Sequence, residues 1–148
     1  MQVAIVYKHL PHYRVSFFDG LRGALAQKSI DLQLLYGKSS SVPKRDEVDL
    51  DWAQPVTNRY FGVGRLSLCW QRLPDWIYNS DLIVLMQHNT ILSNHVVLAK
   101  AKIKGRKIAF WDHGLNLQAP RHSIGNIIKQ SYTTSAFWWF AYTEAVKK

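Results

Sequence analysis

The feature that most constrains this chain is the regular alternation of short apolar runs with segments of helical spacing. Gln2–Tyr7 is an apolar, β-branched run, and apolar residues recur every three or four positions through residues 13–28. Residues 30–36 form a second strand-like run. Because a helix between two strands returns the chain to start the next strand in the same direction, this order predicts a parallel sheet.

The middle of the chain is less regular. Residues 38–55 are polar, charged and interrupted by proline, which predicts a long surface loop, and loops of this length often border a binding cleft. Residues 56–63 can form another strand. We expect residues 70–79 to be a short helical or irregular segment broken at Pro74.

The alternation returns in the second half. Residues 80–86 and 107–111 are strand-like, and between them a helix ending at Gly105 is marked by Leu92, Val96, Ala99 and Ile103. Ser123 can cap a further helix, and the run 137–142 predicts a last buried strand. We therefore expect one domain over residues 1–148 with an α/β fold, a Rossmann-like doubly wound parallel sheet that has helices on both faces.

Charge narrows the choice of partner. Nineteen Lys and Arg against ten Asp and Glu give a net charge of +9, which favours an anionic partner: nucleic acid, an anionic membrane face or a phosphate-bearing small molecule. The aromatic residues fall mainly in apolar runs such as 137–142, which predicts core packing, so we expect no nucleic-acid partner. The same charge predicts peripheral, salt-sensitive contact with anionic membranes.

Two features that the sequence lacks, a membrane-spanning run and a leader pattern, predict the cellular location of the protein. No apolar run approaches the roughly 20 residues of a membrane span, and the chain opens directly into a strand-like run with no leader pattern. We therefore expect a cytoplasmic protein. Its positive charge also suggests a peripheral position at the inner face of the membrane. The lone Cys69 is expected to be a small buried hydrophobic residue.

Candidate site residues cluster after the expected strands. Ligands of doubly wound sheets bind beyond the carboxyl ends of the strands, where the strand order reverses. Four of the six histidines fall at such positions: His9, His12, His88 and His113. Either ordinary loop polarity explains this distribution, or the imidazoles share a hydrogen-bonding and acid/base site.

Other chemistries are disfavoured by pattern. The separation of His9 from His12 is unlike the helical i, i+4 pair that aims two imidazoles at one ion, and a zinc site would need Asp112 and His113 to join. We expect no metal. A nucleophile elbow and a phosphate-binding P-loop are both missing from the sequence. The partial glycine run at residues 62–67 is weak support for dinucleotide binding.

Whole phrases of the sequence resemble a known family. They are YKHLPHYRVSFF from Tyr7, SDLIVL from Ser80, AFWDHGLNLQ from Ala109 and WFAYTE from Trp139. They resemble the N-terminal domain of family 4-like bacterial glycosyltransferases over nearly all of the chain. The most specific elements are the Pro-x-Tyr-Arg turn and the Trp-x-His-Gly turn, although relatives often carry Gly where this chain has Asp112.

The resemblance implies the acceptor-side, N-terminal half of a GT-B fold, with a separate C-terminal donor-binding domain that these 148 residues do not contain. It implies His113 as the catalytic residue facing the donor sugar. Gly114 would let backbone approach that sugar. The implied substrate-binding residues are His9, His12, Tyr13, Arg14, His88, Asp112, Gly114 and Gln118.

The resemblance also implies the activity. It is that of a hexosyltransferase of cell-envelope polysaccharide or glycolipid synthesis, which moves a sugar from a UDP- or GDP-sugar to a glycan or lipid-linked acceptor, with no tightly bound cofactor. Since the family's Glu-x7-Glu donor pattern is missing, we expect the isolated chain to be inactive. The alternative is a non-catalytic binding module or split subunit that pairs with a separate donor-binding chain.

Overall fold

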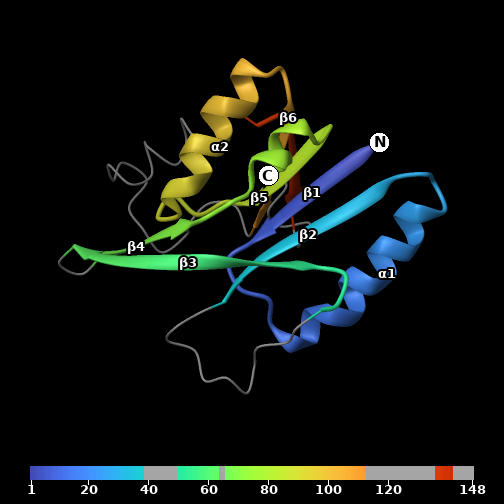
Figure 1. Cartoon of the computed structure of the whole chain (residues 1–148), viewed down its shortest axis with the longest axis horizontal. Coiled ribbons are helices and arrows are strands. Elements are labelled where there is room, and N and C mark those ends of the chain that lie inside the picture. The colour runs from blue at the N-terminus through green and yellow to red at the C-terminus, as the bar shows by residue number, and fades with distance from the viewer. Residues whose placement is uncertain (39–49, 64–65, 113–135, 142–148) are drawn as a thin grey trace.

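A computed structural model describes residues 1–38, 50–63, 66–112 and 136–141. Within these residues seven strands form one sheet in the order β4-β3-β2-β1-β5-β6-β7 (Figure 1). Their bounds are β1 Gln2–Tyr7, β2 Asp31–Lys38, β3 Gln54–Val63, β4 Leu66–Gln71, β5 Leu82–Met86, β6 Lys107–Asp112 and β7 Trp138–Ala141. All neighbouring pairs are parallel except β3 and β4. The expected mostly parallel α/β sheet is therefore confirmed.

The central strands are apolar on both faces, as buried parallel strands must be. In β1, Ala4 and Val6 belong to one hydrophobic cluster, and Val3 and Ile5 belong to the other. Two helices cover these faces: α1 (Val15–Ala26), which follows the 3-10 turn η1 (His12–Arg14), and α2 (Leu92–Ile103). Figure 1 shows α1 and α2 on opposite sides of the sheet. Helices on both faces were predicted from the alternation and are found.

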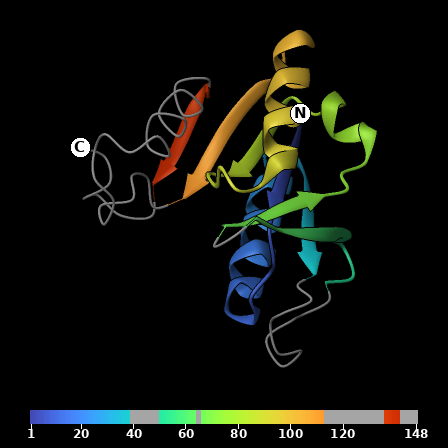
Figure 2. The same cartoon turned by 90° about the vertical axis from the view of Figure 1, so that its left-hand side faces the viewer.

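The first correction concerns residues 66–71. The sequence did not predict β4, which forms an antiparallel hairpin with β3. The helical or irregular segment expected over 70–79 is confirmed from residue 72 on, because the irregular residues 72–74 are followed by the 3-10 helix η3 (Asp75–Asn79). β3 pairs with β2 only through Gln54–Thr57, so residues 58–63 continue past the last residue of β2. The hairpin crosses the parallel strands at a steep angle (Figure 2). The described residues of the glycine run, 62–63 and 66–67, therefore pair with each other across a hairpin and do not lead from a strand into a helix.

The second correction concerns the buried face of α2. Of the four residues that marked this helix, Val96 is 37% exposed and Ile103 is 86% exposed. The buried residues are instead Ser93, Asn94, Val97 and Ala101. The polar side chains of Ser93 and Asn94, at the start of the helix, face the protein interior. The spacing of apolar residues cannot predict this, because it assigns only apolar residues to the buried face. The helix ends before Gly105, as predicted, and Gly105 has the left-handed φ of 63° that suits this position.

The third correction concerns the last strand. The aromatic run was expected to be buried, but β7 lies at the outer edge of the sheet beside β6 (Figure 2). Trp139 packs beside Phe110, while Trp138 is 59% exposed and Phe140 is 42% exposed. Exposed aromatic side chains are thus present on this protein. No helix among the described residues is both long and apolar enough to cross a membrane.

Candidate functional site

The strand order reverses between β1 and β5. From β1 the chain proceeds outward through β2 and β3, then returns to add β5, β6 and β7 on the other side. The loops that leave β1 and β5 consequently diverge to opposite faces, and doubly wound sheets bind their ligands in the resulting crevice. His9 follows β1 and His88 follows β5, so the structure brings these two histidines to neighbouring strand exits at the reversal of strand order.

The exit of β1 leads through Pro11 into η1 and then α1. Here His12 and Tyr13 are exposed, their rings meet edge to face with centroids 5.8 Å apart, and Arg14 lies over the Tyr13 ring at 5.7 Å. Tyr13 is 68% exposed, so it does not pack beneath the helix. Neither η1 nor α1 has a side-chain cap or an acidic residue in its first turn. The positive end of α1 is thus accompanied by a cation, which suits an anionic or hydroxyl-rich ligand.

The hairpin forms a second layer across these exits. The Gln71 amide donates to the Tyr7 carbonyl at 3.0 Å, and the Asn58 amide donates to the Lys8 carbonyl at 2.7 Å. On the β5 side, the Cys69 N–H donates to the Thr90 carbonyl at 2.8 Å. Side chains of one face of the hairpin therefore fix the backbone immediately after β1, and its main chain fixes the loop after β5.

The loop after β5 is held from within α2. The Asn94 amide donates to the Met86 carbonyl at 2.9 Å, and the same carbonyl accepts the His88 N–H at 2.8 Å. The Ser93 hydroxyl accepts the Gln71 N–H at 3.2 Å, which joins α2 to the hairpin. Gln71, Ser93 and Asn94 are all nearly completely buried. Buried polar groups of this kind are normally hydrogen-bonded, and here their partners are the backbone of the strand exits.

Gly37 and Asn58 meet where β2 ends and the hairpin begins. A Cβ atom added at Gly37 would overlap the side chain of Asn58. The close approach of this glycine lets Asn58 reach the Lys8 carbonyl, and the Asn58 amide also lies 3.2 Å from the Tyr60 hydroxyl. A glycine in a strand is thus required here by side-chain packing and not by its φ angle.

One cation and one thiol lie beneath the hairpin. The Lys8 ammonium is 5.7 Å from the Tyr60 ring centroid, and the backbone N–H of Lys8 donates to the Met86 sulfur at 3.2 Å. Burial raises the pKa of the Cys69 thiol, and the positive charge of Lys8 and a hydrogen bond with Tyr60 lower it by less. Cys69 is therefore a neutral, fully buried thiol near pH 7, in line with the structural role expected for it.

The remaining sequence-predicted residues divide into two groups. Asp112 is the last residue of β6, beside the end of β5, so its backbone lies at the same sheet edge as His9 and His88. His113, Gly114 and Gln118 lie outside the described residues. Their roles, and that of the Trp-x-His-Gly turn, therefore stay predictions.

Sequence reasoning missed the residues that hold the crevice together. Asn58 lies in the strand predicted over 56–63, Gln71 in the segment predicted to be helical or irregular, and Asn94 in the predicted helix before Gly105, and none of the three was predicted as a site residue. A signal was present for Gln71: in residues 66–71, Leu66, Leu68 and Trp70 alternate with smaller or polar residues, which is a strand pattern. The buried face of β4 carries Cys69 and Gln71, whereas Leu68 and Trp70 lie on the outer face. Hydropathy alone would therefore assign the two faces of this strand the wrong way round.

Two further features of the described residues bear on ligand binding. No group of three or more His, Cys, Asp or Glu side chains gathers in the part of the chain that the structure describes. A shallow depression lined by Met1, Asp81, Gly105, Arg106 and Lys107 lies at the opposite, amino-terminal edge of the sheet. An Asp81–Arg106 ion pair of 4.0 Å crosses it, and it is remote from the strand exits.

Comparison with known proteins adds a structural relative. No protein-family model matches the chain, and no curated protein matches it in sequence. Among solved structures, it is similar to an alpha-glucosyltransferase in complex with UDP and a 13-mer DNA containing a central A:G mismatch, with a TM-score of 0.56 and 14% identity. The match covers 97% of this chain and 37% of that one, so the chain spans little more than a third of the glucosyltransferase's length. At this identity the likeness establishes a shared fold.

Proposed function

We propose that this chain is the acceptor-side half of a two-domain glycosyltransferase that transfers a hexose from a UDP- or GDP-sugar to a glycan or lipid-linked acceptor of the cell envelope. The observation that carries the proposal is the reversal of strand order between β1 and β5, with His9 and His88 at the two exits. The fold shared with a UDP-complexed glucosyltransferase supports it, and so does the resemblance of the first exit and of the Trp-x-His-Gly turn to family 4-like enzymes.

The residue types fit this chemistry. Glycosyl transfer develops positive charge on the sugar and negative charge on the departing phosphate, so the site needs hydrogen-bonding groups for hydroxyls and cations near the phosphates. His9, His12 and His88 can donate or accept hydrogen bonds near neutral pH. Arg14 supplies positive charge at the start of α1. In this proposal His113 contacts the donor sugar, while Asp112, Gly114 and Gln118 line the sugar site and Tyr13 the acceptor site.

A donor-binding unit outside these 148 residues completes the proposed site. The chain contains two glutamates, Glu47 and Glu144, which cannot form a Glu-x7-Glu pattern. The donor is a co-substrate, and the proposal includes no metal or tightly bound cofactor. The net charge of +9 supports a cytoplasmic position at the inner membrane face, close to lipid-linked acceptors.

Calorimetry on the isolated chain tests whether donor binding requires a separate unit. We expect no measurable binding of UDP- or GDP-hexoses at micromolar concentrations and no turnover, because the groups that hold the diphosphate belong to the other unit. Micromolar donor binding or turnover by this chain alone would contradict the two-domain account.

Variants of the chain joined to a compatible donor-binding domain test the site itself. His113→Ala should lower kcat by roughly 100-fold or more while the melting temperature stays unchanged, since a hydrogen bond made in the transition state contributes to rate and not to folding. His95→Ala is the comparison for a structural histidine: the His95 ring of α2 lies 3.1 Å from the Asn89 carbonyl of the loop after β5, so this substitution should lower the melting temperature. If His113→Ala keeps wild-type kcat, His113 is not part of the site.

A further inference from the structure

The hairpin has an outer face whose chemistry differs from that of its inner face. Along β3 and β4, Asn58, Tyr60, Cys69 and Gln71 point inward to the strand exits, so the alternate residues point outward. The outward residues are Arg59, Phe61, Leu68 and Trp70, continued by Arg72 just after β4. We call these five residues the ribbon face.

The ribbon face places arginine beside exposed aromatic rings. Arg59 lies directly opposite Trp70, and Phe61 lies opposite Leu68. Phe61 is 48% exposed, Trp70 is 37% exposed, and both arginines are exposed. Directly opposed side chains in an antiparallel pair have Cβ atoms about 5 Å apart, and diagonal pairs such as Arg59 and Arg72 are still within mutual reach. Two guanidinium groups and two aromatic rings therefore share one exposed face of the hairpin.

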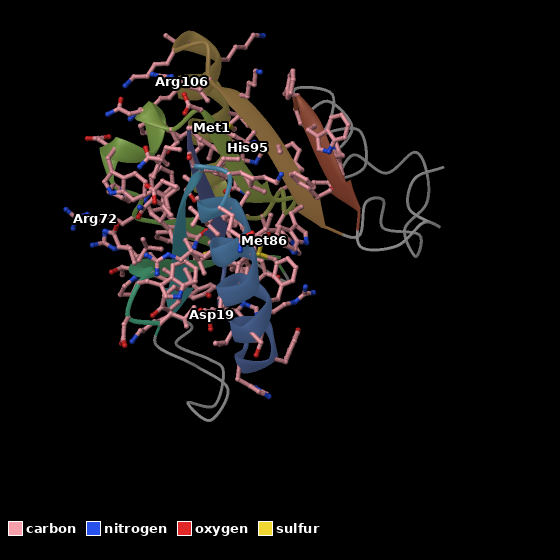
Figure 3. The ribbon with its side chains drawn as sticks, turned by 90° about the vertical axis from the view of Figure 1, so that its right-hand side faces the viewer. Met1, Asp19, Arg72, Met86, His95 and Arg106 are labelled. Carbon is pink, nitrogen blue, oxygen red and sulfur yellow. The ribbon has the colours of Figure 1, made fainter. Side chains whose placement is uncertain are left out.

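The arginines of this strip differ from other cations of the protein. Lys100 pairs with Asp75 and Arg106 with Asp81, while Arg22 stacks on Trp52. Among the described residues no carboxylate forms an ion pair with Arg59 or Arg72. Figure 3 shows Arg72 pointing away from the rest of the molecule. Two adjacent like charges without a counter-charge are unfavourable, and an external anion relieves the repulsion.

We propose that the ribbon face binds single-stranded nucleic acid, with Arg59 and Arg72 on successive phosphates and Trp70 and Phe61 stacked on unpaired bases. Exposed aromatic rings interleaved with cations are the arrangement that binds single strands without sequence preference. Paired bases in a duplex have their faces covered, so stacking selects the single strand. This surface is independent of the proposed glycosyl transfer, because it faces away from the strand exits.

Charge placement favours this ligand over an anionic membrane. Arg59 lies between Trp70 across the hairpin and Phe61 two residues along its own strand. Deep insertion of both rings would draw the guanidinium group of Arg59 towards the hydrocarbon layer, which carries an energetic cost. Bases, in contrast, can stack on the rings while their own phosphates reach the arginines.

Fluorescence anisotropy with a labelled thymidine oligomer of about 20 nucleotides at about 50 mM salt tests the proposal. Each neutralised phosphate of a single strand contributes about 0.7 to the slope of log affinity against log salt concentration. The double variant Arg59→Gln/Arg72→Gln should therefore lower that slope by about 1.4 and weaken binding about ten-fold or more. Trp70→Ala should weaken binding at least about five-fold with the slope unchanged, and Trp70→Phe should restore most of the loss.

Matched controls separate this surface from general charge. Lys28→Gln/Lys102→Gln removes the same charge from two exposed positions on α1's C-terminal side and α2, and Phe137→Ala removes an exposed ring from a different edge of the sheet. Both should bind the oligomer like the wild type. The proposal is overturned if the control pair loses as much affinity as the arginine pair, if a duplex of equal length binds as tightly, or if the arginine pair affects binding only to phosphatidylglycerol vesicles. Circular dichroism confirms that each variant is folded.

Discussion

Replacing Gly37 by alanine tests whether the packing at the end of β2 controls the exit of β1. The added Cβ would overlap Asn58, whose amide donates to the Lys8 carbonyl at 2.7 Å. Overpacking of this kind costs about 1–3 kcal/mol, and losing the partly buried hydrogen bond adds about 0.5–1.5 kcal/mol. We therefore expect Gly37→Ala to lower the free energy of unfolding by about 2–4 kcal/mol, measured by urea denaturation.

The matched control lies in the neighbouring strand β3. A Cβ added at Gly62 of β3 meets no atom within 4 Å, so Gly62→Ala should be neutral or raise stability by up to about 1 kcal/mol. A double-mutant cycle sharpens the test, because Asn58→Ala removes the side chain that the new methyl group would strike. In that background Gly37→Ala should cost less than about 1 kcal/mol, which gives a coupling energy of at least about 1 kcal/mol. Effects that add within about 0.5 kcal/mol would refute the packing argument.

Two further predictions concern local geometry and titration. Gly105→Ala should lower the free energy of unfolding by about 1–2 kcal/mol, because φ is 63° at this position and a side chain there strains the backbone. The space around Gly105 is open, so no steric contact adds to this cost. Urea denaturation that finds no change in stability would contradict the prediction. Burial raises the pKa of the Cys69 thiol, so the folded state binds the thiol proton more tightly than the unfolded state. The resulting contribution to the free energy of unfolding is fully present below the unfolded pKa of about 8.5. It is lost as the pH rises through the higher pKa of the folded state. The wild type should therefore lose more stability than Cys69→Ala between about pH 8 and pH 10, and parallel pH profiles would exclude Cys69 as the cause.

The aromatic residues changed one functional argument. The sequence case against a nucleic-acid partner assumed that these residues pack in the core, and that assumption is wrong for Phe61, Trp70, Trp138 and Phe140, all of which are substantially exposed. An aromatic run in a sequence indicates a strand, but whether that strand is central or at an edge depends on which strands pair beside it. The exposure of these aromatic side chains therefore removes the reason for excluding a nucleic-acid partner. The net charge of +9 was known from the sequence and did not exclude such a partner.

The sequence by itself determined the order of the main elements and the mostly parallel sheet. The apolar runs of β1, β2, β5 and β6 and the glycine after α2 are local signals, because strand and helix periods are written into neighbouring residues. The same order predicted that His9 and His88 follow strands, and their nearness at one sheet edge follows from parallel pairing.

Only the tertiary structure decided what surrounds those exits. Gln71 is buried because its amide reaches the Tyr7 carbonyl, 64 positions away in the chain, and Asn94 is buried because it reaches the Met86 carbonyl. Polarity gives such residues the appearance of solvent positions, and the partner that makes their burial favourable is set by the fold. The contacts of the hairpin with the strand exits, the polar inward face of α2 and the exposure of β7 all depend on contacts between distant segments, so no local pattern could specify them.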